Sequence, residues 1–156
     1  MTNEFTSDFF SINEVELVYR SKTRAADRPK ITTSKDAHNL LMLSWDFNKM
    51  DLLEEFKIIL LDRKNSCIGI SNIATGGITG CVVDPKVIFA TALKARATGI
   101  ILSHNHPSGN LKPSQEDISI TKKLIGGGKL LDINILDHLI LTSENYCSLT
   151  DEGLIP

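Results

Sequence analysis

Apolar and polar positions alternate along the chain with two periods, and these periods predict a series of strands and helices. Val15, Leu17 and Tyr19 alternate with glutamates, which predicts a half-buried strand near the N-terminus. The stretch 99–103 is continuously apolar, as is typical of a central strand covered on both faces. Further strands are expected at about 54–61, 67–73, 131–135 and 139–142.

Three helices are predicted between these strands. Thr33 and Asp36 form a capping box before the first helix, whose apolar residues over 37–45 fall mostly on one side. A second helix starts at Pro85, a residue favoured at the first helical position. A third is expected from about 114 to 125, ending in a loose segment at the three glycines 126–128. Strands and helices alternate, so we predict an α/β fold with a mixed sheet between helices.

Composition narrows the class of protein. A chain of 156 residues with 42% hydrophobic residues has the size and profile of one globular domain. The three cysteines are odd in number and form no C-x-x-C motif, which favours a reduced cytoplasmic protein. We find no signal peptide and no apolar run near the roughly 20 residues that span a bilayer, so no membrane partner is expected. The oligomeric state cannot be read from the sequence.

Charge gives little support to nucleic-acid binding. The formal net charge of -2 predicts no overall attraction to a polyanion. Within residues 20–30, five basic side chains are relieved only by Asp27. Two interpretations of that stretch stay open: a solvated loop, which we favour, and a small patch that contacts phosphates.

The candidate chemistry is concentrated in residues 103–117, which read SHNHPSGNLKPSQED. His104 and His106 lie one residue apart where the apolar strand ends, and side chains at i and i+2 of an extended chain point to the same side. Asp117 follows Ser114 by three residues and would be a third ligand if the helix start packs against the strand end. Two imidazoles and one carboxylate leave a position open for water, as in catalytic zinc sites.

Each part of this segment also has an ordinary structural interpretation. H-x-H alone is a weak motif, and Ser114 with Asp117 makes a capping box without any metal. The joint pattern of H-x-H, a proline-glycine turn and a helix presenting Ser and Asp favours a metal centre. The donor set suits zinc, and iron, cobalt or manganese would also fit. The H-x-E and P-C-x-x-C signature of zinc deaminases is absent from the sequence.

The same segment resembles a known family. H-x-H, seven residues, S, two residues and D match the motif of the JAMM metalloproteases, also called JAB or MPN-plus. HNHPSG, the following PSxxD and the later LLDINILDHLIL resemble the RadC branch of bacterial JAB proteins, over roughly 54–141. The resemblance implies a JAB/MPN-like, cytidine-deaminase-like architecture with a mixed, curved β-sheet flanked by helices. It also implies a zinc-dependent hydrolase that cleaves a peptide or isopeptide bond, with a protein or peptide as substrate.

The resemblance implies a role for each site residue. One Zn²⁺ per chain would be held by His104, His106 and Asp117. Glu54 would be the general base and then the general acid, and Ser114 would donate a hydrogen bond to the oxyanion. The strand pattern also selects Glu54, because a carboxylate on an otherwise apolar strand face needs a partner. Its alternative is a strand-end residue in solvent.

Two other polar positions are interpreted as structural. Asn105, which lies between the two histidines, is expected to anchor the turn at 107–109 rather than contact substrate. Asp137 and His138 could orient a metal ligand through a hydrogen bond. We favour a structural pair there, because His138 sits between two apolar stretches.

We expect three parts along the chain: an N-terminal extension of a strand and a basic loop (1–30), a RadC-like JAB/MPN domain (31–145) and a C-terminal tail (146–156). RadC proteins are often described as DNA repair proteins, and full-length members carry an N-terminal helix-hairpin-helix region, which residues 1–30 do not resemble. Two alternatives to a peptidase stay open. A DNA-processing factor would need phosphate-binding groups near the metal, with loop 20–30 as the candidate. A non-catalytic binding module would need none of the presumed site residues, and their presence speaks against it.

Overall fold

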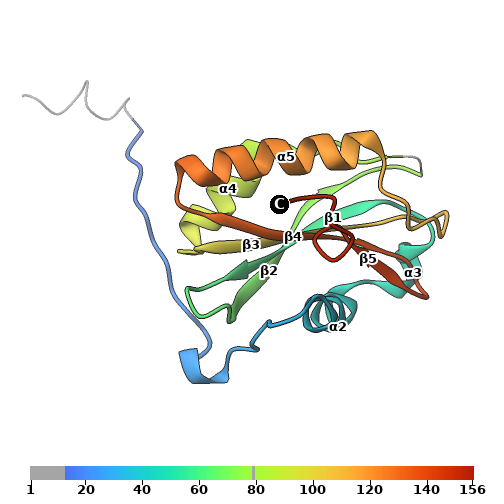
Figure 1. The fold of residues 1–156 in the computed structure, drawn as a ribbon. Coiled ribbons are helices and arrows are strands. Elements are labelled where there is room, and N and C mark those ends of the chain that lie inside the picture. Colours follow the sequence, from blue (N-terminus) through green and yellow to red (C-terminus); the bar gives the residue numbers. More distant parts are fainter. Residues whose placement is uncertain (1–12, 79) are drawn as a thin grey trace, which may run out of the picture.

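The computed structural model describes residues 13–78 and 80–156, and its centre is one five-stranded mixed sheet (Figure 1). The strand order is β2-β1-β3-β4-β5. β3 and β4 run parallel, and the other neighbours run antiparallel. The strands are β1 (Glu55–Leu61), β2 (Cys67–Thr75), β3 (Gly99–Asn105), β4 (Asn134–Leu141) and β5 (Tyr146–Ser148).

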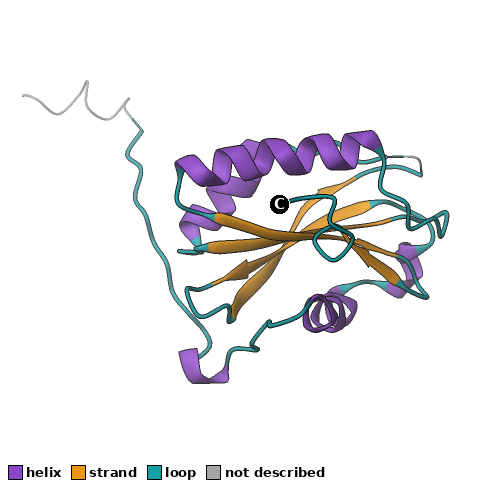
Figure 2. Ribbon diagram, in the orientation of Figure 1, coloured by secondary structure: helices purple, strands orange, loops and turns teal. Residues whose placement is uncertain are grey.

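Helices cover both faces of the sheet (Figure 2). α4 (Pro85–Lys94) and α5 (Gln115–Leu130) lie on one face, and α2 (Ser34–Ser44) lies on the other. A 3₁₀ turn, η1 (Ala25–Asp27), precedes α2, and a short helix, α3 (Phe47–Met50), follows α2. This arrangement confirms the predicted α/β class with a mixed sheet flanked by helices. None of the helices within the described ranges combines the length and apolar character needed to cross a bilayer.

Alternation along the central strands divides the core into two layers. In β1, Ile58 and Leu60 pack in the layer beneath α4 and α5, whereas Ile59 and Leu61 pack in the layer beneath α2. Every residue of β1 and β3 is buried, which explains the continuous apolar runs 58–61 and 99–102. Full burial of one such leucine or isoleucine contributes roughly 1.5–3 kcal/mol. These two strands therefore form a rigid support for the residues that follow β3.

The predicted helix starts are confirmed. The Thr33 hydroxyl accepts a hydrogen bond from the Asp36 N–H, and the Asp36 carboxylate accepts one from the Thr33 N–H. Asp84 caps α4 through the Lys86 N–H, with Pro85 at the first helical position. Such caps satisfy N–H groups that have no partner in the first turn of a helix.

The predicted end of the third helix is wrong, because α5 continues through the three glycines to Leu130. Close packing explains two of them. A Cβ atom at Gly127 would lie 2.9 Å from the Phe89 ring, and one at Gly128 would lie 2.3 Å from the backbone oxygen of Ile133. The glycines therefore let the end of α5 approach its neighbours closely, and the segment is not a loose helix stop.

The predicted strands at 131–135 and 139–142 are a single strand, β4. The polar residues Asp137 and His138 suggested a break, but both are buried with hydrogen-bond partners and stay within the ladder. The predicted tail, 146–156, also belongs to the folded core. It contributes β5 to the sheet, and Leu149 and Ile155 to a small apolar cluster around Ile140.

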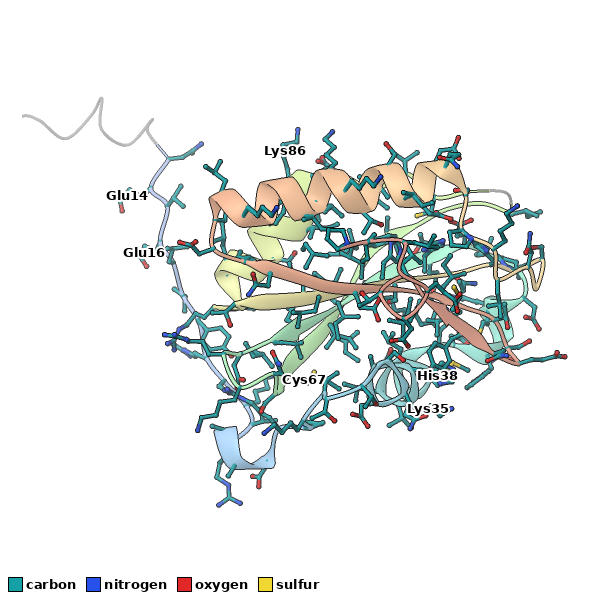
Figure 3. The ribbon with its side chains drawn as sticks, in the orientation of Figure 1. Glu14, Glu16, Lys35, His38, Cys67 and Lys86 are labelled. Atoms are coloured by element: carbon teal, nitrogen blue, oxygen red, sulfur yellow. The ribbon has the colours of Figure 1, made fainter. Side chains whose placement is uncertain are left out.

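The half-buried strand predicted over residues 15–19 is not formed. Val15 and Leu17 are 89% and 92% exposed, and the segment pairs with no strand of the described residues. Figure 3 shows Glu14 and Glu16 on an extended segment that stands away from the sheet. Alternation predicts which face a strand would bury, but a strand also needs a neighbour for its backbone hydrogen bonds. Residues 1–12 of the predicted extension lie outside the described residues.

Candidate metal centre

His104, His106 and Asp117 converge where β3 ends and α5 begins. One ligand atom from each lies within 4.8 Å of the others, so this group could hold a metal ion. The two Nε2 atoms of the histidines are 2.9 Å apart. Asp117 Oδ1 lies 3.2 Å from Nε2 of His104, and Oδ2 lies 3.7 Å from Nε2 of His106. The position at the carboxyl end of a central parallel strand is a common one for sites in α/β sheets.

Asp117 is directed to the site by the capping box of α5. Its Oδ2 accepts a hydrogen bond of 2.7 Å from the Ser114 N–H, and the Ser114 hydroxyl accepts one of 3.1 Å from the Asp117 N–H. The cap fixes the carboxylate, and its other oxygen faces His104. Capping and ligation therefore do not exclude each other at Asp117.

The hydrogen bonding of His106 leaves the correct nitrogen free for a metal. Its Nδ1 lies 2.6 Å from the backbone oxygen of Asn110. A carbonyl oxygen only accepts, so Nδ1 carries the hydrogen and donates it. In the neutral ring, Nε2 then presents a lone pair toward His104 and Asp117. The loop from 107 to 110 holds this carbonyl in place, with Gly109 at a φ of 81°.

The ligand separations fit one tetrahedral ion. Atoms bonded to zinc at about 2.0–2.1 Å with tetrahedral angles are about 3.3 Å apart. The two Nε2 atoms are 2.9 Å apart, and Asp117 Oδ1 lies 3.2 Å from Nε2 of His104, both close to that value. Two imidazole nitrogens and one carboxylate oxygen are also the donor types that zinc accepts in catalytic sites. The residues fit the group that the sequence predicted.

The carboxylate and the imidazoles at the centre shift one another's pKa values. Burial would raise the pKa of the Asp117 carboxyl, but its interactions with the imidazoles of His104 and His106 outweigh burial and hold that pKa below its usual value. The hydrogen bond to Asp117 raises the pKa of His106. Burial holds the pKa of His138, which lies behind His104, well below its usual value. An anionic carboxylate thus stands beside two imidazoles, as a cation site requires.

The side chain of Asn105 is structural, but its hydrogen bonds go to residues 50, 53 and 55 and not to the turn that it was predicted to anchor. The side chain is fully buried; its Oδ1 accepts a 2.7 Å hydrogen bond from the Glu55 N–H. Its Nδ2 donates to the backbone oxygens of Met50 and Leu53, at 2.7 and 2.8 Å. One side chain between the two histidines thus fixes the backbone on both sides of Glu54.

Glu54 and Ser114 line the same cleft as His106 and Asp117. Glu54 immediately precedes β1, and its backbone extends the pairing with β2 through Gly76 and Gly77 at 2.7 and 3.1 Å. The cleft has a volume of 680 Å³.

Glu55, unlike Glu54, does not line this cleft: it is buried in the sheet with its carboxylate 3.9 Å from the Lys57 ammonium. α5 contributes Glu116, and loops flanking the metal centre contribute further lining residues, which include Ile78, Cys81, Pro107, Ser108 and Lys112.

The structural role favoured for Asp137 and His138 holds for Asp137, which also accepts the His138 N–H at 2.7 Å, but the His138 ring contacts the metal centre. The Asp137 carboxylate accepts hydrogen bonds from the Ser148 hydroxyl and the Thr150 N–H, beyond β4. The His138 ring lies behind the metal centre, with Nε2 at 2.8 Å from Nδ1 of His104. Its Nδ1 lies 2.6 Å from the hydroxyl of Thr121, a residue that sequence reasoning missed. The available signal was spacing: Thr121 follows Asp117 by one helical turn.

The basic segment 20–30 lies at the far end of β1 from the metal centre. Lys30 pairs with Ser66, and Arg28 forms a 3.2 Å ion pair with Asp62, both in the turn after Leu61. The opposite end of β1 carries Phe56, which pairs with His104. A strand of this length spans on the order of 20 Å. The segment therefore brings no phosphate-binding group to the cleft.

Comparisons with known proteins agree with the geometry. Residues 31–154 match the family model described as RadC-like JAB domain. A UPF0758 protein of Flavobacterium johnsoniae is 44% identical over 126 residues, covering 80% of this chain and 53% of that protein. A UPF0758 protein of Alkaliphilus metalliredigens is 42% identical over 142 residues, covering 90% and 60% respectively. This chain spans about half the length of the curated relatives that it matches.

Proposed function

The chain belongs to the RadC-like JAB domain family, and on that premise we propose that it is a zinc-dependent hydrolase of peptide or isopeptide bonds. One observation carries the proposal. The ligand atoms of His104, His106 and Asp117 converge, and His106 and Asp117 line the same cleft as Glu54 and Ser114. Three protein ligands leave a coordination position open, which is the arrangement of catalytic rather than structural zinc sites.

A bound zinc ion would supply Lewis acidity, polarising the scissile carbonyl and acidifying a water molecule. Glu54 takes a proton from the attacking water while the water oxygen bonds to the carbonyl carbon. When the carbon–nitrogen bond breaks, Glu54 gives that proton to the leaving amine. The backbone around Glu54 is held by Asn105 and by β2, which limits the movement of the carboxylate between the two transfers.

Ser114 stabilises the oxyanion in this scheme. Its hydroxyl oxygen already accepts the Asp117 N–H at 3.1 Å, so the hydroxyl hydrogen is free to be donated elsewhere. The side chain is exposed at the cleft, at the start of α5. A donor held by a helix cap is aligned before the charge develops, which is the basis of oxyanion stabilisation.

The cleft favours a peptide over a phosphodiester substrate. Glu54, Glu116 and Asp117 contribute three carboxylates to its lining, and Lys112 is the one lysine or arginine among the lining residues. Apart from a bound metal ion, the lining therefore offers a polyanionic backbone one cationic side chain beside three carboxylates. With the basic segment at the far end of β1, a DNA-processing activity at this centre has little support.

The test is hydrolysis of quenched fluorescent peptides and of a lysine isopeptide by the zinc-loaded protein. Glu54→Gln should lower kcat/KM by at least about 100-fold, because general acid–base catalysis contributes that much, while metal content is unchanged. Glu116→Gln is the matched control, since Glu116 lines the same cleft and has no assigned role. Equal activity of the Glu54→Gln variant and the wild type would overturn the assignment, and loss of activity in both variants would show that only the charge of the cleft matters.

A further inference from the structure

We propose that Thr121 and His138 are positioning residues, forming a hydrogen-bonded relay that fixes the tautomer of His104 so that its Nε2 lone pair faces the metal. This inference rests on the metal centre of the proposed function. The relay runs from the backbone of α5 through Thr121 and His138 to His104, with contacts of 2.5, 2.6 and 2.8 Å. These three successive contacts determine which atom of Thr121, His138 and His104 carries each hydrogen.

The first hydrogen is set by a backbone carbonyl. The Thr121 hydroxyl lies 2.5 Å from the backbone oxygen of Asp117, which can only accept, so the hydroxyl donates there. A hydroxyl has a single hydrogen, and its oxygen is then an acceptor toward Nδ1 of His138, 2.6 Å away. His138 therefore carries its hydrogen on Nδ1.

The remaining hydrogens follow in sequence. A neutral His138 with its hydrogen on Nδ1 has a lone pair on Nε2, which accepts from Nδ1 of His104 at 2.8 Å. His104 then has its lone pair on Nε2, directed at His106 and Asp117. The opposite polarity would place a hydrogen on Nε2 of His104, where it would exclude a metal from that nitrogen.

Burial keeps water from forming hydrogen bonds that would compete with those of the relay. Thr121 and His138 are fully buried, and His104 is 1% exposed. The Phe56 ring stacks on His104 at 6.0 Å between centroids and meets His138 edge-on at 5.5 Å. Because water does not reach the rings, the hydroxyl of Thr121 is the group that determines the tautomer of His138. Hydrogen-bond partners behind ligating histidines generally act in this way.

The first test is zinc affinity, measured by competition with a chromophoric chelator. Thr121→Val keeps the shape of the side chain and removes the acceptor for Nδ1 of His138. We expect zinc affinity to fall about 10- to 100-fold, as for other partners behind metal ligands. Thr121→Ser restores the hydroxyl and should bind within about threefold of the wild type. Thr91→Val is the matched control, because Thr91 makes the same helix back-bond, to Val87 at 2.7 Å, away from the site.

The second test needs no variant and no activity. Nitrogen NMR of the histidine rings in the zinc-loaded wild type should show His138 with its hydrogen on Nδ1 and a bare Nε2. A hydrogen on Nε2 of His138 would overturn the relay, and this holds even if Thr121→Val fails to fold.

The outcomes separate the relay from the function on which it rests. Zinc binding by the wild type with a loss confined to Thr121→Val supports both. Equal binding by the wild type, Thr121→Val and Thr91→Val would overturn the relay alone. A wild type that takes up no zinc would overturn the metal centre and the relay with it.

Discussion

Asp117 Oδ1 lies 3.2 Å from Nε2 of His104, while the other oxygen of the same carboxylate caps α5. The two roles can be separated by Asp117→Asn, which keeps an oxygen to accept the Ser114 N–H but removes the anionic ligand. We expect far-UV circular dichroism to be unchanged, the metal-free protein to lose no more than about 2 kcal/mol of unfolding free energy, and zinc binding to be lost.

The chain offers a matched control for Asp117→Asn in α2. Asp36 occupies the same position of a second capping box and faces no histidine pair. Asp36→Asn should destabilise the fold in denaturant titrations and leave zinc affinity unchanged. Wild-type zinc affinity in Asp117→Asn would show that the carboxylate is a cap and not a ligand.

Asn105 is expected to be essential for stability as well as for the position of Glu54. Asn105→Ala leaves one buried N–H and two buried carbonyls, those of Glu55, Met50 and Leu53, without their partner. Each unsatisfied group costs about 1–3 kcal/mol, so unfolding free energy should fall by at least about 2 kcal/mol in urea titration. Asn72→Ala is the control, because the Asn72 side chain makes one exposed hydrogen bond of 3.3 Å. A change below about 0.5 kcal/mol for Asn105→Ala would contradict this assignment.

The glycines of α5 should respond to alanine in opposite directions. Nothing lies within 4 Å of a Cβ at Gly126, so Gly126→Ala should stabilise the protein by roughly 0.5–1 kcal/mol through helix propensity. A Cβ at Gly128 would meet the Ile133 backbone oxygen at 2.3 Å, so Gly128→Ala should destabilise it by about 1–3 kcal/mol. Thermal unfolding of the two variants checks both signs. Equal shifts would refute the close-packing explanation.

The capping box of α2 predicts a dependence of stability on pH. Backbone and side-chain hydrogen bonds from Thr32, together with those from Thr33, lower the pKa of Asp36 from 3.8 to about 2. A carboxyl whose pKa is depressed in the folded state stabilises it fully above the unfolded pKa, and loses that contribution as the pH falls toward the folded pKa. The difference in unfolding free energy between wild type and Asp36→Asn should therefore be constant near neutrality and shrink between about pH 4 and pH 2. A difference that grows on acidification would reverse the assignment.

The sequence predicted most of the fold and the convergence of His104, His106 and Asp117, because those depend on local rules. Capping residues determined the starts of α2, α4 and α5, and the H-x-H spacing at the end of an apolar strand brought two imidazoles together. What it missed depends on contacts between distant elements. Gly128 matches the sequence pattern of a helix stop, but it is needed because the Ile133 backbone packs against it. The role of Thr121 depends on its contact with His138, which comes from β4. Val15 and Leu17 had the alternation of a strand but no neighbour to pair with.

The most direct test of the metal centre is the zinc content of the protein after zinc loading and removal of free ion, measured by elemental analysis. We expect about one zinc per chain in the wild type, the same in His38→Asn, and essentially none in His106→Asn. His38 is a suitable control because it is a histidine of α2, on the other side of the sheet from α5 (Figure 3). A wild type without zinc, or equal zinc in the wild type and His106→Asn, would contradict a centre built from His104, His106 and Asp117.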